Sequence, residues 1–106
     1  MVPTTVPTLS PCELDPADPI PLGSVLMDVR ERDEWDAGHV PEALHIPLGE
    51  LPGRVAEVPV DGRIMVVCHS GTRSARATAW LNEAGYDAVN VAGGMVDWQR
   101  AGLPVV

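Results

Sequence analysis

Residues 63–84, RIMVVCHSGTRSARATAWLNEA, pass from an apolar run through a short polar turn into an alanine-rich segment. The consecutive apolar residues of Arg63–Val67 are typical of a strand that is buried on both faces. The segment from Arg73 to Ala84 contains no Gly or Pro, so it predicts a helix, and Gly85 is a natural C-terminal stop. A buried strand followed closely by a helix predicts an α/β unit.

The same alternation extends on both sides of this unit. The other expected elements are a short helix started by Ser10 and Pro11, strands at 25–29, 43–46 and 88–91, and helices at 31–36, 48–57 and 95–100. We therefore expect a three-layer α/β/α domain around a mainly parallel sheet. A chain of 106 residues is long enough for one such domain, which we place at 9–106 after a flexible lead at 1–8.

The charge of the chain is unbalanced, because 15 acidic residues face 7 arginines and no lysine. A formal net charge of -8 repels nucleic-acid phosphates and anionic lipid, so we expect neither nucleic-acid nor membrane binding. No apolar run approaches the roughly 20 residues of a membrane span, and the N-terminus lacks the features of a secretory signal. We expect a cytoplasmic protein with free thiols at Cys12 and Cys68, and a basic protein is a candidate partner.

The turn between strand and helix carries the chemistry. Ligands bind beyond the carboxyl ends of parallel strands, and a helix start presents free N–H groups with partial positive charge. A cysteine at that point has a lowered pKa, and the same N–H groups can hold an anion. Gly71 allows the backbone to curl around the sulfur. We predict that the Cys68 sulfur lies in a cup of amide hydrogens rather than sealed inside the core.

The remaining polar residues of the turn have two readings each. Ser70 and Thr72 either donate hydrogen bonds to a sulfur intermediate or cap the following helix. Arg73 either supplies positive charge to the site or ties the loop to the body through a carboxylate. The competing view of Cys68 as a small buried residue gives no reason for Gly71 and Arg73.

Four ordered motifs in this chain resemble those of a single rhodanese domain, over about residues 9–103. They are Asp28-Val29-Arg30-Glu31, residues 34–47 (EWDAGHVPEALHIP), the loop Cys68-His69-Ser70-Gly71-Thr72-Arg73-Ser74, and residues 93–98 (GGMVDW). The resemblance implies a five-stranded sheet with strand order 1-5-4-2-3 and a monomer. It also implies sulfur transfer from thiosulfate or a persulfide donor to a thiol or cyanide acceptor, through a persulfide on Cys68.

The resemblance assigns further roles around that nucleophile. It implies substrate binding by the loop residues His69, Ser70, Gly71, Thr72 and Arg73. Asp28 and Arg30 are either substrate residues or braces of the loop, and we favour the brace, with Asp28 available to pair with Arg73. Ser74 is also expected to brace the loop. We expect no metal and no organic cofactor, because the adjacent Cys68 and His69 lack a second Cys/His pair at ligand spacing.

Two other functions remain open. The first is a persulfide-binding or sulfur-relay module without turnover. The second is a phosphatase or arsenate reductase, whose loops in this fold are one residue longer than the four residues between Cys68 and Arg73. Many members of the rhodanese family carry Arg or Lys where this chain has His69, so we expect weak use of thiosulfate and a preference for persulfide donors.

Several residues outside the loop need a role. His39 is either a catalytic base or a hydrogen-bonding residue of a turn, and we favour the turn. Cys12 is either a resolving thiol or a spectator, and we favour the spectator. The three tryptophans, Trp35, Trp80 and Trp98, are expected to pack in the core or at its rim.

Overall fold

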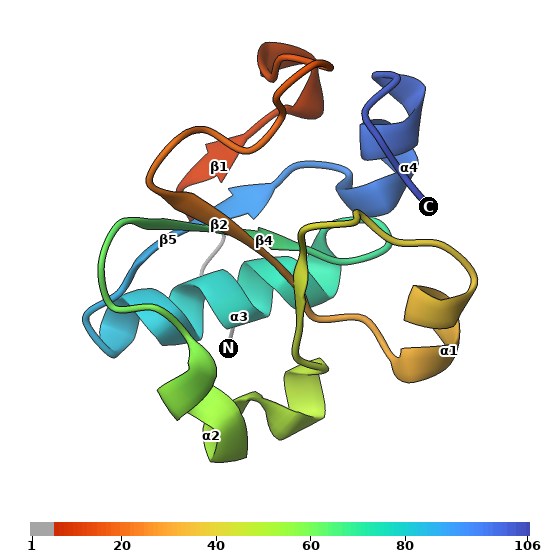
Figure 1. Ribbon diagram of the computed structural model, residues 1–106. Coiled ribbons are helices and arrows are strands. Elements are labelled where there is room, and N and C mark those ends of the chain that lie inside the picture. Colours follow the sequence, from red (N-terminus) through yellow and green to blue (C-terminus); the bar gives the residue numbers. More distant parts are fainter. Residues whose placement is uncertain (1–5) are drawn as a thin grey trace.

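The computed structural model describes residues 6–106 and contains one five-stranded sheet (Figure 1). The strands are β1 (Thr8–Leu9), β2 (Ser24–Asp28), β3 (Leu44–His45), β4 (Arg63–Val67) and β5 (Asp87–Val91). Their order across the sheet is β1-β5-β4-β2-β3, and each neighbouring pair is parallel. Both the fold class and the strand order inferred from the resemblance are confirmed, and β4 lies in the middle of the sheet.

Helices connect the strands and cover both faces of the sheet. They are α1 (Arg32–Asp36), α2 (Leu51–Arg54), α3 (Thr72–Glu83) and α4 (Gly94–Arg100), with three-residue 3-10 helices η1 (Pro11–Glu13), η2 (Leu48–Glu50) and η3 (Val55–Glu57). The expected helix at 48–57 is divided into η2, α2 and η3. Pro52 and Gly53 lie in the middle of this segment, and both disfavour a long regular helix.

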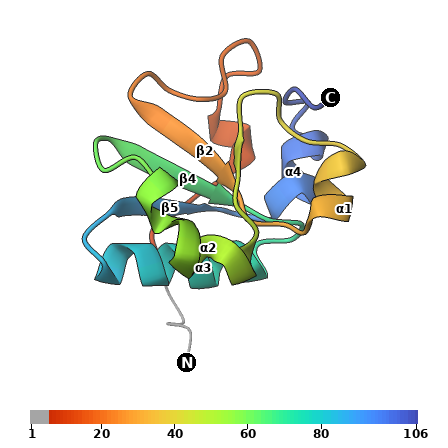
Figure 2. The same cartoon turned by 60° about the horizontal axis from the view of Figure 1, so that its bottom comes forward.

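The side chains of β4 alternate between two apolar clusters, one on each face of the sheet. Ile64 and Val66 pack on the face that α2 and α3 cover, whereas Met65 and Val67 pack on the face of α4. Figure 2 shows α2 and α3 side by side on one face, with α4 on the other. The expectation that β4 is buried on both faces is confirmed, and burial on both sides fixes the strand end from which Cys68 follows.

The N-terminal boundary differs from the expectation. Thr8 pairs with Asn90 in the sheet, and the amide of Asn90 donates to the carbonyl of Pro7 at 2.8 Å. The expected flexible lead at 1–8 therefore overlaps β1, and residues 1–5 lie outside the described residues. A β-strand on the edge of a parallel sheet needs only backbone partners, so the unremarkable sequence at this point gave little signal.

Three strands end together at the carboxyl edge of the sheet. Asp28 is in register with Val67 on one side and with His45 on the other. The segments that leave these strands, including α1 and the Cys68 loop, consequently meet at one edge. Within residues 6–106, the structure contains no helix that is long and apolar enough to cross a membrane.

Candidate active site

The Cys68 sulfur accepts hydrogen bonds from the loop that follows it. The amide of Gly71 donates to Sγ at 3.1 Å, and the hydroxyl oxygen of Ser74 lies 3.2 Å from Sγ. Gly71 has a φ of 107°, and a Cβ there would lie 3.3 Å from the amide nitrogen of Gly93. Only glycine adopts this backbone without strain. The predicted cup of donors around the sulfur is thus confirmed, and Ser74 contacts the sulfur directly.

These donors control the ionisation of the thiol. Burial by itself raises the pKa of Cys68, because it disfavours the charged form. Hydrogen bonds from the Ser74 hydroxyl and from the amides of Ser74, Gly71 and Ser70 outweigh burial, so the net pKa lies below the ordinary value for a thiol. The site therefore favours a thiolate, which is the nucleophilic form of cysteine.

The accessibility of the sulfur differs from the expectation. Cys68 is only 1% exposed and packs in the apolar cluster beneath α3, while the neighbouring His69 and Ser70 are exposed. The residue directly follows β4, and its side chain packs in the same apolar cluster as Ile64 and Val66. In this conformation a donor reaches Sγ only after residues of the loop shift.

A second helix start holds the loop from the opposite side. The amide of Met95 donates to the carbonyl of Cys68 at 2.8 Å, and the amide of Val96 donates to the carbonyl of His69 at 3.1 Å. Gly94 comes so close to these two carbonyls that a Cβ at this position would overlap both. The Gly-Gly pair that precedes α4 therefore fixes the backbone on which the sulfur is mounted.

Arg73 is bound by a carboxylate from α1. Its two terminal nitrogens donate to the two oxygens of Glu34 at 2.7 and 2.8 Å. This hydrogen bonding lowers the pKa of Glu34 to about 2 and raises the pKa of Arg73 above its usual value. The predicted pairing of Arg73 with Asp28 is wrong, and of the two roles considered for Arg73 the geometry favours the brace.

Asp28 pairs instead with its near neighbour Arg30. The Asp28 carboxylate is fully buried and accepts from the Arg30 guanidinium at 2.8 to 3.0 Å. The same guanidinium donates to the carbonyls of Glu34 and Gly38. Asp28 and Arg30 thus brace α1 and the turn after it. They support the Cys68 loop only indirectly, because α1 carries Glu34.

Asn90 is a further contact that the sequence did not reveal. It lies on β5, is 7% exposed, and its side-chain nitrogen donates to the carbonyl of Gly71 at 3.3 Å. Its Oδ1 is buried without a hydrogen-bond partner among the described residues. This contact adds a second hold on the glycine whose amide points at the sulfur. Apart from its place at the end of β5, nothing in the sequence marked Asn90 as part of the site.

The structure also tests the roles that were considered for His39, Ser70, Thr72 and Cys12. His39 Nδ1 lies 2.9 Å from the Trp35 carbonyl, and its ring stacks on the Trp35 indole at 3.8 Å between centroids, as the turn reading predicts. Gly71 is the N-cap of α3, and within residues 6–106 no side-chain hydrogen bond caps this helix, so the capping role considered for Ser70 and Thr72 is wrong. Cys12 is an exposed free thiol in η1.

The tryptophans occupy three different environments. Trp98 is fully buried on α4, with its indole nitrogen donating to the Pro104 carbonyl at 3.0 Å. Trp35 is half-buried at the rim, while Trp80 on α3 is 39% exposed. The expected packing roles hold for Trp98 and Trp35, and Trp80 is the most exposed of the four Trp and Tyr side chains.

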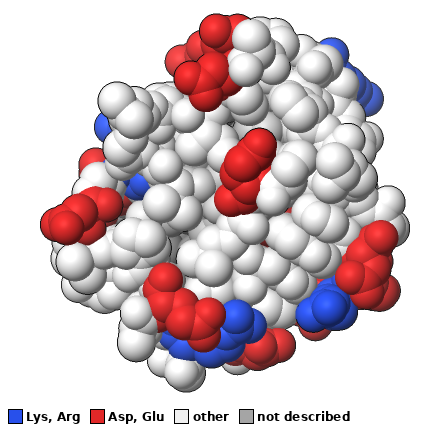
Figure 3. Space-filling model, in the orientation of Figure 1, with Lys and Arg blue, Asp and Glu red and all other residues white. Residues whose placement is uncertain are grey.

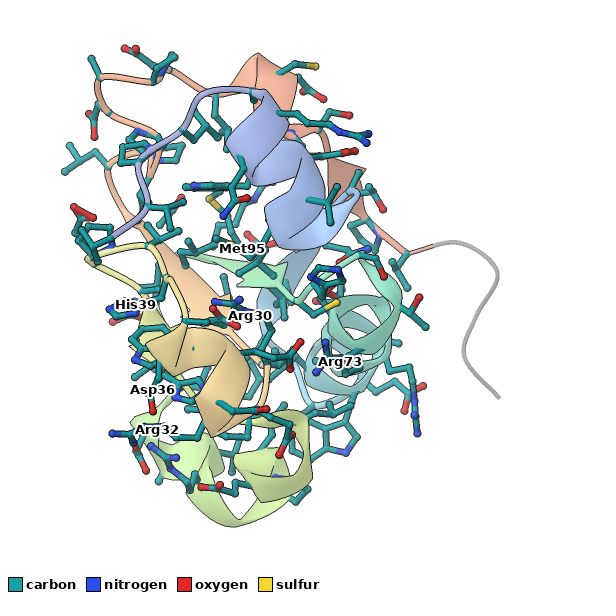
Figure 4. The ribbon with its side chains drawn as sticks, turned by 90° about the vertical axis from the view of Figure 1, so that its right-hand side faces the viewer. Arg30, Arg32, Asp36, His39, Arg73 and Met95 are labelled. Carbon is teal, nitrogen blue, oxygen red and sulfur yellow. The ribbon has the colours of Figure 1, made fainter. Side chains whose placement is uncertain are left out.

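A hollow of about 200 Å³ lies beside the loop, between α1 and α4. His69 and Met95 line it on the loop side, and Arg30, Glu34 and Gln99 contribute polar groups. Figure 4 faces this edge of the molecule, where Arg30 from the β2–α1 connection, Arg73 from α3 and Met95 from α4 approach one another. The hollow provides an approach toward the loop from solvent.

The fold and the loop together define an open parallel α/β domain with a hydrogen-bonded cysteine at the mouth of a helix. A model of the rhodanese-like domain family matches residues 16–101. The chain therefore belongs to the rhodanese-like domain family, and the resemblance found in the sequence is confirmed.

Individual relatives indicate the general activity of the family. A sulfurtransferase of Allochromatium vinosum is 41% identical over 83 residues, which cover 77% of this chain and 78% of that protein. The putative sulfurtransferase YtwF of Bacillus subtilis is 39% identical over 79 residues, covering 74% and 77% respectively. The crystal structure of a rhodanese-related protein from Thermoplasma volcanium has a TM-score of 0.81 at 30% identity, covering 95% of this chain and 98% of that one. The two relatives that are named as sulfurtransferases support sulfur transfer as the general activity.

Proposed function

We propose that this protein is a sulfurtransferase that carries sulfane sulfur as a persulfide on Cys68. The observation that carries the proposal is the convergence of the Gly71 amide and the Ser74 hydroxyl on Sγ, which together with neighbouring amides lower the thiol pKa. A thiolate held by positioned donors is suited to a two-step transfer, because the same donors stabilise the anion before and after each step.

The two steps balance without a cofactor. The Cys68 thiolate attacks the outer sulfur of thiosulfate or of a persulfide donor, a new S–S bond forms, the donor's S–S bond breaks, and sulfite or the donor thiolate leaves. An acceptor thiolate or cyanide then attacks the outer sulfur of the Cys68 persulfide. This step forms the acceptor persulfide or thiocyanate and returns the Cys68 thiolate.

A persulfide on Cys68 places its reactive atom farther out than the buried Sγ. The outer sulfur extends about 2 Å beyond Sγ. It is therefore this outer atom, rather than Sγ itself, that meets the acceptor at the mouth of the loop. Loading from a persulfide donor and unloading to a thiol acceptor pass through the same arrangement of three sulfur atoms, so both steps need the loop to give access to the outer sulfur on Cys68.

Electrostatics favour a persulfide donor over thiosulfate. The two guanidinium groups nearest the loop are both neutralised, Arg73 by Glu34 and Arg30 by Asp28. The residue after the nucleophile is the exposed His69, an imidazole in place of the permanently charged side chain that an Arg would supply. A dianion such as thiosulfate gains little from this site.

Chemistry that depends on a free thiol needs a reducing compartment, and we propose that the protein works in the cytoplasm.

Two assays on the full chain test the proposal. The first follows thiocyanate formed from thiosulfate and cyanide, and the second follows intact mass after treatment with thiosulfate or glutathione persulfide. We expect a one-sulfur mass gain that a reductant reverses, with faster loading from glutathione persulfide. Cys68→Ser should lose all loading, while Cys12→Ser serves as the matched control and should retain it.

The other outcomes of these assays distinguish the alternatives. A reducible mass gain without thiocyanate formation would assign the protein to a sulfur relay without turnover. Hydrolysis of an aryl phosphate that is lost in Cys68→Ser would assign it to the phosphatases. Sulfur loading that persists in Cys68→Ser would contradict the proposed nucleophile.

A further inference from the structure

Arg76 on α3 stands apart from the other arginines. Among residues 6–106, it is the one arginine without a carboxylate within ion-pair distance. Each of the other six, Arg30, Arg32, Arg54, Arg63, Arg73 and Arg100, has such a partner. Residues 1–5 contain no acidic side chain. In a chain with 15 acids and 7 basic residues, an exposed cation without a partner is unusual and can accept a carboxylate from another molecule.

An apolar groove of about 400 Å³ lies next to Arg76, between α3 and the segment of η2 and α2. Figure 2 shows the ribbons of α2 and α3 on the same side of the sheet. Its lining residues are Leu48, Gly49, Leu51, Pro52, Arg76 and Trp80. Trp80 contributes an indole that is 39% exposed, which is large for an aromatic side chain without a partner. The groove thus combines an apolar surface with one positive charge.

The groove starts close to the Cys68 loop. Arg73, Arg76 and Trp80 follow one another at spacings of three and four residues, so they share one flank of α3. Arg73 marks the loop end of this flank, where it binds Glu34. Seven residues of helix from Arg73 to Trp80 span about 10 Å. A partner lying along this flank would have one end near the mouth of the candidate active site.

We propose that this groove docks a protein acceptor of sulfur, through a segment that carries an acidic and an apolar side chain near the acceptor cysteine. The proposal rests on the proposed sulfurtransferase function and names its acceptor class. The carboxylate of the segment pairs with Arg76, and the apolar side chain packs on Trp80 and Leu48. The acceptor thiolate attacks the outer sulfur of the Cys68 persulfide, takes that sulfur, and leaves the Cys68 thiolate.

The charge of Arg76 favours an acidic partner segment, whereas the net charge of the chain favours a basic partner. A net charge of -8 favours a basic partner at long range. On the face shown in Figure 3, however, the acidic side chains form separate groups rather than one continuous patch. At physiological salt, exposed charges are largely screened beyond about 8 Å, so the groups inside the groove decide which segment fits there.

Two matched peptides test this inference on the persulfide of the full chain. One contains a cysteine, three glycines, a glutamate and a leucine, and the other has lysine in place of the glutamate. Each transfer rate is divided by the rate with cyanide, which has no side chain to dock. We expect transfer to the glutamate peptide to be about threefold to fivefold faster than to the lysine peptide, as for one exposed charge pair.

Charge reversal and a control make the result specific. Arg76→Glu should reverse the preference toward the lysine peptide, whereas Arg100→Glu, an exposed arginine on α4, should leave the preference unchanged. Trp80→Ala should slow transfer to both peptides by a similar factor. Equal rates with the two peptides in the wild type, or an unchanged preference in Arg76→Glu, would overturn the proposal.

A binding measurement separates this inference from the enzyme function. Fluorescence anisotropy of dye-labelled peptides that lack the cysteine reports docking to the Cys68→Ser protein, in which no sulfur moves. Tighter binding of the glutamate peptide that is lost in Arg76→Glu would support the docking groove even if cyanide yields no thiocyanate. Equal binding of both peptides would contradict the proposed docking groove, whatever the result of the transferase assays.

Discussion

The helices α3 and α4 begin in the same way but serve different purposes. Each follows a parallel strand at the carboxyl edge, and each has an N-cap glycine with positive φ, 107° for Gly71 and 69° for Gly93. At α3 the amides converge on the Cys68 sulfur, whereas at α4 the amides of Met95 and Val96 bind the backbone of the Cys68 loop. One helix start forms the site and the other supports it.

The length of the preceding connection decides between these two uses. Four residues separate β4 from α3, which is enough for the chain to curl around the side chain of the first of them. Only Ala92 and Gly93 separate β5 from α4, so this helix starts directly against the neighbouring loop. The same positive helix end therefore stabilises a sulfur anion in one place and peptide carbonyls in the other.

The sharpest test of this comparison is Gly94→Ala at the supporting helix start. A Cβ at residue 94 would overlap the carbonyls of Cys68 and His69, and φ at this position is +57°. We expect a loss of about 3 kcal/mol or more in the free energy of unfolding, measured by urea denaturation, because both strain and overlap contribute.

Gly102→Ala is the matched control for that change. Gly102 also has a positive φ, of 74°, but a Cβ there would meet nothing within 4 Å. It should therefore cost only about 1 kcal/mol, from the backbone conformation alone. Equal losses in the two variants would mean that α4 does not clamp the loop.

A smaller effect is expected from Ser74→Ala at the helix start that forms the site. The Ser74 hydroxyl is the strongest of the groups that lower the Cys68 pKa, so its loss should raise that pKa toward the ordinary thiol value. A higher pKa lowers the thiolate fraction near neutral pH, and the rate of alkylation falls with it.

The pH profile of alkylation in a Cys12→Ser background measures this change. The difference from the parent should disappear at high pH, where both thiols are ionised. Ser70→Ala is the control, because Ser70 is exposed and acts on the sulfur through its backbone amide alone. A profile for Ser74→Ala that superimposes on that of its parent would refute the role of the hydroxyl.

The smallest effect concerns the ion pair that anchors α3 to α1. The pKa of Glu34 is lowered to about 2 in the folded protein, mainly by its hydrogen bonds with Arg73. A carboxyl group with a lowered folded pKa stabilises the fold above its unfolded pKa, near 4.3, and this stabilisation is lost as the pH falls toward 2.

Glu34→Gln should therefore reduce stability by about 1 to 2 kcal/mol near neutral pH, since the pair is partly exposed to solvent. The difference from wild type should shrink between about pH 4.3 and pH 2. Asp36→Asn, which removes an exposed pair with Arg32, should change stability by less than about 0.5 kcal/mol. Denaturation series across pH would contradict this account if the Glu34→Gln difference stayed constant down to pH 2.

The sequence was a good guide wherever local pattern decides the structure. The apolar run of β4, the turn glycine Gly71 and the alanine-rich α3 were each predicted from their own residues, and the resemblance supplied the strand order. The partner of Arg73 was out of reach, because Glu34 is 39 residues away along the chain and belongs to a polar helix without a marked pattern. The predicted partner, Asp28, lies on a strand next to β4 but is already bound to Arg30.

The sequence by itself determined most of the helices and strands. It also determined that a cysteine precedes a turn that contains glycine. Backbone conformation and burial periodicity depend on neighbouring residues, so they can be recognised locally. Only the tertiary structure decided that the Cys68 sulfur is buried, that α4 clamps its loop and that Glu34 and Asn90 support it. It also decided that Arg76 has no carboxylate partner among residues 6–106. These features depend on how separate segments meet at the edge of the sheet, and packing over the whole domain sets that arrangement.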